Sequence, residues 1–590
     1  MKPRRHLLPT ALAITAVSAL LIPLGGCSSQ TSQEQAQPAA LSAPLPDASV
    51  FPSDAATSTS ATATGLFCSA PVVIVSGTDL PSQLRAASLT RALGAPSLLA
   101  NTEDLAGELK RLETKYVLTV GEANVPESNL QVRPAPNTAK ELSKLTGLQL
   151  AGASLPEVSS GAEAVKALVA LAPDTVVESS IPPPTTSDRA ESSGAVAFPK
   201  LSQPDPTNPD LAECSPADST GTPGPTASPS PTAAPDPSVT RAESSHPVAL
   251  VDADTASVTA VANLLARGSQ VVWASDSANH ANSASLPISS DDTKALKSAG
   301  SVLALGDTFG TSADLRWRTQ VLRAGVELPG GGYDLFGGKR YVALYGTPVT
   351  PALGVLGEQD MEATVKRAAD QAAVYQALTE DTVVPALEII VTVASGDPGK
   401  DGNYSNEWPA EDFVPLVEAA AAAGQYVIID FQPGRADFLT QVKQYEKLLT
   451  YPHVGIALDP EWRLGPDEKP LTRIGSVEAA EVNQVMDYMA QFVTERQLPP
   501  KMVILHQFQI QMLRDRDQIH THYPQTPVLI HADGQGSQPD KQGTWKVLHE
   551  DAPANVHWGW KNFIDEDQPM LTPEQTYSQV DPLPDLVTYQ

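Results

Sequence analysis

Two acidic side chains follow a short apolar run in the C-terminal half of the chain. Residues 454–458 have the length of a buried strand, and Asp459, Pro460, Glu461 and Trp462 follow them directly. Because Pro460 cannot continue a β-ladder, the strand ends there and both carboxyl groups fall at its tip. Residues two apart on an extended chain point the same way, so Asp459 and Glu461 can face one ligand. Paired carboxyl groups of this kind are suited to general acid and base catalysis.

Other apolar runs of the C-terminal region also end in polar residues. Glu388 differs, because it lies within a run, where an inward-pointing acid must be paired or protonated. The candidate catalytic residues are Glu461, Asp459, Asp430, Glu388 and Asp533. The candidate substrate-binding residues are Trp462, Arg463, His506, Gln507, His531, Trp558, Trp560 and Arg435.

The runs that carry these residues predict a barrel. Eight strands with alternating helices in about 250 residues indicate a closed (β/α)8 barrel over residues 339–590, here without its last helix. An open doubly wound sheet is the alternative. A barrel would gather the polar strand tips at one end, where active sites of this fold lie. The predicted strands are 341–345, 386–393, 426–430, 454–458, 502–506, 527–531, 556–560 and 586–589, and the predicted helices are 361–378, 412–423, 437–449, 477–495 and 508–520.

Carboxyl pairs beside aromatic side chains are typical of glycoside hydrolysis, in which one acid protonates the leaving oxygen and the other attacks or positions the nucleophile. The stretch Gly455-Ile-Ala-Leu-Asp-Pro-Glu461 resembles the strand signature of chitinase-like glycosidases. That resemblance implies Glu461 as the acid and Asp459 as its tuner, although Val454 and Ala457 replace two earlier acids of the family. The alternative is a solvent-facing polar rim without catalysis. No phosphate-binding, dinucleotide or metal-ligand motif occurs, so we expect no cofactor and no metal.

Alternating strands and helices also predict a parallel sheet over residues 65–180. Within it, Val73-Ile-Val-Ser-Gly-Thr-Asp-Leu-Pro81, Leu84–Leu89, Gly94–Leu99 and Val117-Leu-Thr-Val-Gly-Glu122 resemble the cell wall-binding repeat 2 pattern. The sequence departs from that family at its last position, where a second glycine is usual. A flavodoxin-like unit of another kind is the alternative. The resemblance implies binding to cell-wall material.

A Pro-, Ser- and Thr-rich stretch over residues 181–246 predicts a linker or insertion. The strand and helix pattern then restarts over residues 247–328. Two interpretations remain open for this second unit. It is either a diverged copy of the first unit or a continuation of the same sheet across the linker.

The N-terminus predicts export. Lys2, Arg4 and Arg5 precede an apolar stretch over residues 7–24, as in a signal peptide. Leu24-Gly-Gly-Cys27 resembles the bacterial lipobox, which implies a signal peptide over residues 1–27 and a diacylglycerol on Cys27. Residues 28–64 are rich in Ser, Thr and Ala and predict a disordered stalk.

The net charge and the cysteine content limit the classes of partner and the covalent links that we expect. A net charge of -29 argues against nucleic acid as a partner. Besides Cys27 the chain has Cys68 and Cys214, which flank the first sheet. In an exported protein we expect them to form a disulfide, with two free thiols as the alternative.

Together these features predict a lipoprotein anchored on the extracytoplasmic face of the cell membrane and reaching into the wall. We expect cell-wall polysaccharide or peptidoglycan as its partner and a glycosidase-like barrel as its active part. The rival hypothesis is a non-catalytic adhesion or scaffold protein whose barrel only binds glycan. A solute-capturing lipoprotein is a third possibility.

Overall fold

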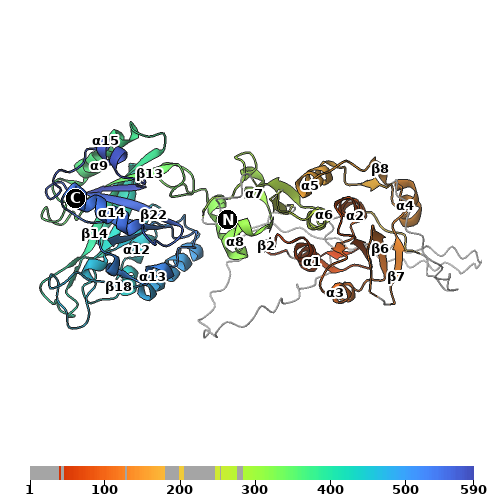
Figure 1. Cartoon of the computed structure of the whole chain (residues 1–590), viewed down its shortest axis with the longest axis horizontal. Helices are drawn as coiled ribbons and strands as arrows, with labels where there is room; N and C mark the ends of the chain where they lie inside the picture. The colour runs from red at the N-terminus through yellow and green to blue at the C-terminus, as the bar shows by residue number, and fades with distance from the viewer. Residues whose placement is uncertain are drawn as a thin grey trace, which may run out of the picture.

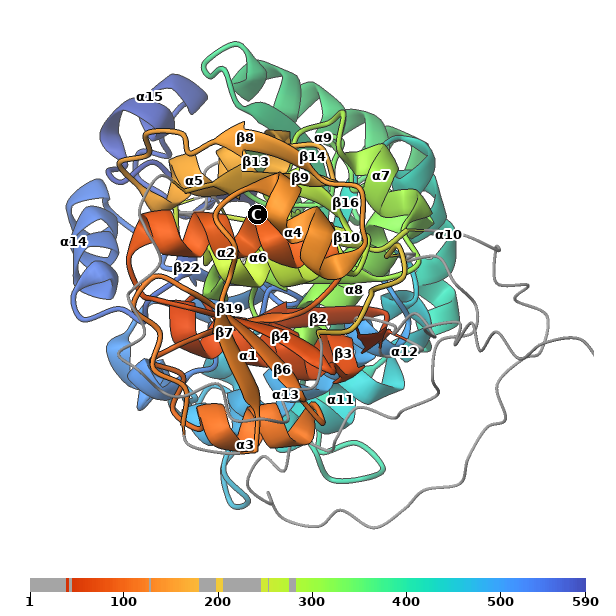
Figure 2. The same cartoon turned by 90° about the vertical axis from the view of Figure 1, so that its right-hand side faces the viewer.

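The computed structural model describes residues 39–41, 45–126, 129–179, 198–204, 246–252, 254–274 and 283–590. The molecule is elongated, with N-terminal α/β sheets at one end and a β-barrel at the other (Figure 1). Seen along the long axis, the N-terminal sheets lie in front of the barrel (Figure 2). The predicted fold class is therefore confirmed: parallel α/β sheets precede a closed eight-stranded parallel barrel.

The first sheet has four parallel strands in the order β5-β4-β6-β7. Its helices begin at side-chain caps, such as Asp79, which accepts a hydrogen bond from the backbone of Ser82. Residues 175–178, which also lie within the predicted sheet region 65–180, do not join this sheet but pair with β8 in a separate two-stranded sheet. The elements are β4 (Val72–Ser76), α2 (Leu80–Leu93), β5 (Ser97–Leu99), α3 (Leu105–Arg111), β6 (Tyr116–Val120), β7 (Gln131–Pro134), α4 (Ala139–Thr146), β8 (Ala151–Ser154), α5 (Gly161–Ala170) and β9 (Thr175–Glu178).

The second unit forms its own sheet, in the order β11-β10-β12-β2, and does not extend the first one. Its edge strand β2 comes from the N-terminal segment of the chain and pairs in parallel with β12. The chain therefore crosses between the two sheets before the first sheet begins. The elements are β2 (Ala48–Phe51), β10 (Val248–Val251), α6 (Val258–Ala266), β11 (Gln270–Trp273), α7 (Thr293–Ser298), β12 (Val302–Leu305) and α8 (Ser312–Ala324).

The prediction of a disordered stalk over residues 28–64 is wrong for its second half. Residues 48–51 form β2, and α1 (Ala55–Leu66) follows, with Ser58, Thr59 and Thr62 fully buried. Small hydroxyl side chains can pack inside because each returns a hydrogen bond to its own helix, as Thr62 does to the carbonyl of Ser58 (2.8 Å). A composition typical of a stalk therefore encodes a closely packed helix.

The two N-terminal sheets share one apolar core. Buried side chains of α1, α2 and α6 and of both sheets belong to a single cluster. Near the chain entry, β1 (Ala40–Leu41) pairs antiparallel with β3 (Phe67–Ser69), which contains Cys68. The predicted disulfide partner Cys214 and the predicted lipidation site Cys27 lie outside the described residues. Both assignments stay predictions.

All eight predicted barrel strands are present, and they close into a barrel through the parallel pair β13 and β14. The order around the barrel is β13-β23-β22-β21-β19-β17-β16-β14. A short strand, β15 (Ser405–Glu407), adds antiparallel to β14. The barrel strands are β13 (Lys339–Gly346), β14 (Thr382–Ala394), β16 (Tyr426–Phe431), β17 (Val454–Leu458), β19 (Val503–Gln507), β21 (Val528–Ala532), β22 (Val556–Asn562) and β23 (Leu586–Tyr589).

The helix predicted over residues 508–520 is wrong. Short 3-10 turns and the two-residue strand β20 (Leu513–Arg514) occupy that stretch. Arg516 explains the difference, because its guanidinium turns inward and donates to the carbonyls of Leu548 and Glu550. The helices around the barrel are α9 (Met361–Gln376), α10 (Ala410–Ala422), α11 (Phe438–Gln444), α12 (Glu446–Leu449), α13 (Ala479–Glu495), α14 (Gln538–His549) and α15 (Pro573–Gln579).

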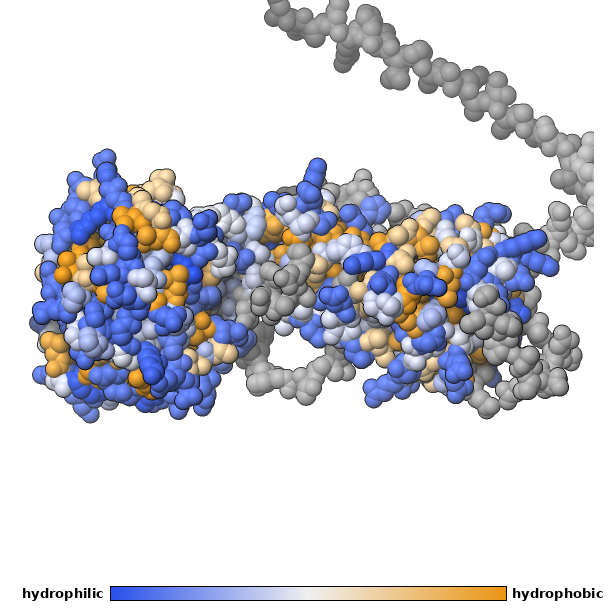
Figure 3. All heavy atoms as spheres, turned by 45° about the horizontal axis from the view of Figure 1, so that its top comes forward, coloured by the Kyte–Doolittle hydropathy of each residue, from blue (hydrophilic) through white to orange (hydrophobic). Residues whose placement is uncertain are grey.

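The barrel interior changes character from one end to the other. Its lower part is apolar and is closed below by Leu328, Leu335 and Phe336, which precede β13. This closed end is joined to the N-terminal part, where Trp317 of α8 donates to the carbonyl of Leu498 (3.0 Å). Among the described residues, no helix combines the length and apolarity needed to cross a membrane. Hydrophilic side chains cover most of the visible face of the barrel (Figure 3).

Candidate active site

The open end of the barrel holds a pocket of about 510 Å³. It lies at the carboxyl ends of the strands, where active sites of this fold are found. Gln590 lines it, and the C-terminus marks the end of the molecule farther from the N-terminal sheets (Figure 1). The lining residues are Tyr345, Leu353, Ile390, Val393, Ala394, Gln432, Asp459, Glu461, Trp462, Phe508, Gln509, Asp533, Gly534, Gln535, Thr544, Lys561, Phe563 and Gln590.

His506 lies at the centre of the charged layer beneath the pocket. Its Nε2 is 2.9 Å from Glu388 Oε1 and 3.9 Å from Asp430 Oδ1, and its Nδ1 is 3.1 Å from Asp533 Oδ2. The side chains of His506, Glu388 and Asp430 are fully buried. Burial alone would lower the pKa of His506, but Asp533 and Glu388 raise it well above its ordinary value. His506 is therefore a buried cation held between carboxylates.

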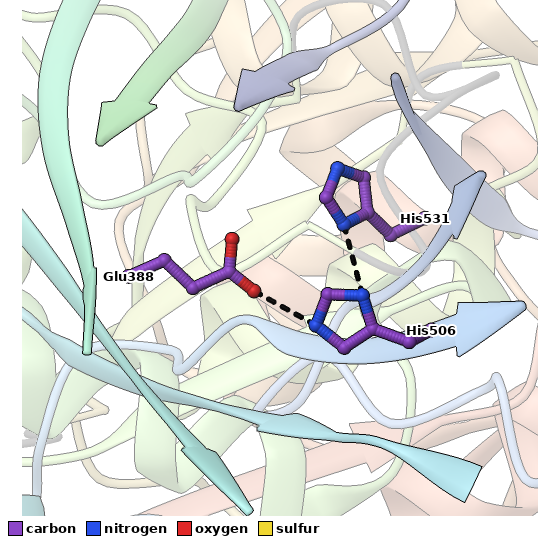
Figure 4. Close-up of side chains that lie close together, drawn as sticks. All are labelled: Glu388, His506 and His531. Atoms are coloured by element: carbon purple, nitrogen blue, oxygen red, sulfur yellow. Dashed lines mark hydrogen bonds and ion pairs between the residues drawn. The ribbon is translucent and has the colours of Figure 1, made fainter. Parts of the chain in front are cut away.

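His531 continues this layer as a neutral group. Its Nδ1 is 3.1 Å from His506 Nδ1 (Figure 4). Its Nε2 is 3.1 Å from the hydroxyl oxygen of Thr588. Burial lowers the pKa of His531 to about 3, so the ring is neutral and its Nδ1 can accept a hydrogen bond from the His506 Nδ1–H, which also faces Asp533. Gly559 makes room for the ring, since a Cβ there would lie 2.5 Å from His531 Cδ2.

Lys561 and Tyr345 belong to the site, although the sequence interpretation did not select them. Lys561 Nζ is 2.9 Å from Asp533 Oδ1 and 3.6 Å from the centre of the Tyr345 ring. The Tyr345 hydroxyl donates to Asp430 Oδ2 (2.8 Å). The signal for Lys561 was its spacing of two from Gly559, which places both on the inner face of β22.

The carboxyl groups of the site are held in different protonation states. Lys561 and His506 overcome the effect of burial and keep the pKa of Asp533 well below its ordinary value. Burial, reinforced by the nearby Asp533, raises the pKa of Glu461 to about 7. Burial and the neighbouring Glu461 raise the pKa of Asp459 well above its ordinary value. Near neutral pH the pocket thus holds an ionised Asp533 beside an acid that can donate a proton.

The two remaining buried acids support this layer from below the pocket. Burial raises the pKa of Asp430 to about 6, although His506 opposes the shift. His506 also lowers the pKa of Glu388, against the effect of burial. The structure thus brings together all five acids that the sequence selected, along with His506 and His531.

Several of the predicted substrate-binding residues lie elsewhere. Trp462 lines the pocket, but Trp558 stacks on His549 of α14 with ring centres 3.6 Å apart. Trp560 is buried beside Trp545 of the same helix. Both tryptophans lie on the outer face of β22, because side chains alternate along a strand.

The other three predicted binding residues hold loops in place. Arg463 Nε is 2.9 Å from Glu481 of α13, which makes it a structural corner. Arg435 donates to a backbone carbonyl and lies over the ring of Tyr404, 4.4 Å from its centre. Gln507 donates to two carbonyls of the loop that follows β19. None of the three lines the pocket.

One group of described residues has the composition of a metal site. Ligand atoms of Glu388, His506 and His531 all lie within 4.8 Å of one another (Figure 4). The same atoms already form a continuous chain of an ion pair and hydrogen bonds, from Glu388 through His506 and His531 to Thr588. Lys561 supplies a second positive charge to this layer. We therefore interpret the group as a charge network that fixes Asp533.

Comparison with known proteins finds no matching family model, no similar curated sequence and no similar solved structure. The resemblances to cell wall-binding repeats and to chitinase-like glycosidases thus stay predictions. The function has to be inferred from the chemistry of the pocket.

Proposed function

We propose that the barrel hydrolyses glycosidic bonds of cell-envelope polysaccharide, with Glu461 as the general acid and Asp533 as the ionised partner. The observation that carries the proposal is that both carboxyl groups line one pocket, with only Asp533 contacted by two cations. Two carboxyl groups kept in opposite protonation states are what glycoside hydrolysis requires.

In this mechanism Glu461 donates its proton to the leaving glycosidic oxygen. Asp533 stabilises the positive charge that develops on the sugar, either by attacking the anomeric carbon or by positioning a water molecule. His506 and Lys561 contact Asp533 at 3.1 Å and 2.9 Å and hold it in one orientation. Trp462, Phe508 and Phe563 supply aromatic surface on which a sugar ring can pack.

The location of the substrate follows from the N-terminal features. The lipobox-like Cys27 would anchor the chain on the outer face of the membrane, and the N-terminal sheets would bind the wall. Gln590 lines the pocket, and the C-terminus lies at the end of the molecule farther from those sheets (Figure 1). That arrangement suits a protein whose active end reaches polysaccharide beyond its anchored end.

The test is the release of reducing ends from isolated cell-wall polysaccharide by the purified chain. We expect Glu461→Gln and Asp533→Asn each to lower the rate about 10²- to 10⁴-fold, the usual contribution of an acid or base. Glu566→Gln is the matched control, because Glu566 is an exposed acid in the loop after β22. Unchanged rates in both pocket variants would refute the assignment.

The rival function predicts a different pattern. If the barrel only binds glycan, the wild-type chain sediments with wall material but releases no reducing ends. In that case Glu461→Gln would change the amount of chain that sediments with wall material, and neither chain would have a measurable rate of hydrolysis.

A further inference from the structure

The lining of the pocket carries more acid than base. Asp459, Glu461 and Asp533 face it together with a single basic side chain, Lys561. Lys561 is already paired with Asp533 at 2.9 Å and packed on the Tyr345 ring. Among the described residues, no ion pair reaches Asp459 or Glu461. The pocket thus presents two carboxyl groups without a protein cation of their own.

Asp459 is the more unusual of the two. It is 1% exposed, and its Oδ1 has no hydrogen-bond donor among the described residues. The 3-10 turn over Pro460–Trp462 begins directly after it, yet its side chain does not cap that turn. An unsatisfied buried carboxyl oxygen is costly, so proteins rarely retain one without a use. Because Asp459 lines the pocket, a bound ligand can supply the missing donor.

The charge of the pocket lining limits which classes of ligand can bind. A sugar that carries a carboxylate or phosphate would bring a further negative charge to the ionised Asp533 and to two acids whose pKa values are already raised. A neutral hydroxyl would satisfy the hydrogen bond but would not favour the ionised form of Asp459. A primary ammonium supplies three donors and a positive charge, and its hydrogen bonds to a carboxylate are the stronger, charge-assisted kind.

We propose that the glycan unit in this pocket carries a free amino group, as in a de-N-acetylated hexosamine, and that its ammonium binds Asp459. This inference rests on the proposed function and adds the substrate class. It also gives the two neighbouring acids different roles. The bound ammonium would lower the pKa of Asp459, which burial and Glu461 raise in the free protein, so Asp459 is ionised in the complex and Glu461 carries the catalytic proton.

Calorimetric titration of the full chain tests the inference by binding alone. The probes are oligosaccharides of glucosamine, galactosamine and mannosamine, each with its N-acetylated counterpart of equal length and linkage. We expect one amine oligosaccharide to bind at least about 10-fold more tightly than its counterpart, as a charge-assisted hydrogen bond would give. Asp459→Asn should remove most of that preference by weakening binding of the amine form more than binding of the N-acetylated form.

Asp565→Asn is the matched control, because Asp565 is exposed in the loop after β22 and should alter neither affinity. Equal affinity for the two forms, or tighter binding of the N-acetylated one, would overturn the inference and leave the proposed function standing. Absence of binding to every oligosaccharide, together with no hydrolysis of wall polysaccharide, would overturn both.

Discussion

The hydroxyl and amide side chains buried between α1 and α6 are neutral and hydrogen-bonded, whereas the acids at the open end of the barrel, its mouth, are ionisable and incompletely paired. Between α1 and α6, Thr59 Oγ1 lies 2.7 Å from Thr259 Oγ1 and 3.0 Å from Ser257 Oγ. Asn263 Nδ2 donates to Thr62 Oγ1 and to the carbonyl of Ser97. Each of these groups has a partner within the protein, so the cluster needs nothing from outside.

The barrel mouth buries the carboxyl groups of Glu388, Asp430 and Asp459 and half-buries those of Glu461 and Asp533, close to one lysine and two histidines. Asp459 Oδ1 and Asp430 Oδ1 have no hydrogen-bond donor among the described residues. Such an arrangement is poor for stability, because a buried charge is expensive unless it is paired and hydrogen-bonded. The comparison thus separates buried polar groups that stabilise the fold from buried polar groups that are available to bind a ligand.

Among the variants that test this contrast, we expect the largest loss of stability from removal of the central cation, His506. His506→Leu leaves Glu388 and Asp533 without the partner that lies 2.9 Å and 3.1 Å away. We expect the free energy of unfolding of the barrel to fall by about 3–5 kcal/mol, as when one partner of a buried pair is deleted. Denaturant titration followed by tryptophan fluorescence measures the loss.

A double variant separates the charge from the packing. His506→Leu combined with Glu388→Leu should recover part of the lost stability, because the uncompensated carboxylate is then gone. A loss of less than about 1 kcal/mol for His506→Leu alone would contradict the view that the network is a set of buried charges.

A smaller effect is expected in the N-terminal cluster. Asn263→Leu removes the amide that accepts from the backbone of Ser97 (2.9 Å) and donates to Thr62. We expect a loss of about 2–3 kcal/mol, the cost of leaving buried groups unsatisfied. Hydrogen exchange should quicken in α1 and α6, while exchange in the barrel strands stays unchanged. Exchange that quickens equally in the barrel would refute the separation of the two regions.

Much of the barrel and its site could be predicted because both depend on strand periodicity and strand ends. Asp430, Asp459 and Asp533 each end or follow a predicted strand, and parallel strands bring their carboxyl ends to one rim. Their convergence needed no knowledge of side-chain packing. His506 was selected in the same way as a substrate-binding residue, but it is fully buried beneath the pocket and does not line it.

The failures arose where tertiary contacts decide the outcome. Trp558 and Trp560 were selected as aromatic sugar binders, but the inner face of β22 belongs to Gly559 and Lys561. The glycine is required by the His531 ring of the adjacent strand, which no local pattern reveals. The packed helix α1 was missed for a related reason, since its Thr59 packs against hydroxyl groups about 200 positions away in the sequence.

The smallest effect concerns the pH dependence of stability at the mouth. Burial raises the pKa of Glu461 from 4.5 to about 7, so the folded chain binds this proton more tightly than the unfolded chain does. The stabilisation is complete below pH 4.5 and is lost as the pH rises through 7. Glu461→Gln should therefore reduce the fall in the free energy of unfolding between pH 4.5 and pH 7 by about 1–2 kcal/mol. This is less than the full pKa difference implies, because solvent reaches the side chain.

Unfolding of the two chains at pH 4.5 and at pH 7.5 measures this difference. The stability of the Glu461→Gln variant should still fall with rising pH, because burial also raises the pKa of Asp430 to about 6 and that of Asp459 well above its ordinary value. Glu566→Gln should follow the wild type, since Glu566 is exposed. Equal slopes for wild type and Glu461→Gln would mean that Glu461 titrates as an ordinary surface acid. The contrast between an incompletely paired mouth and a satisfied N-terminal cluster would then rest on the deeper carboxyl groups alone.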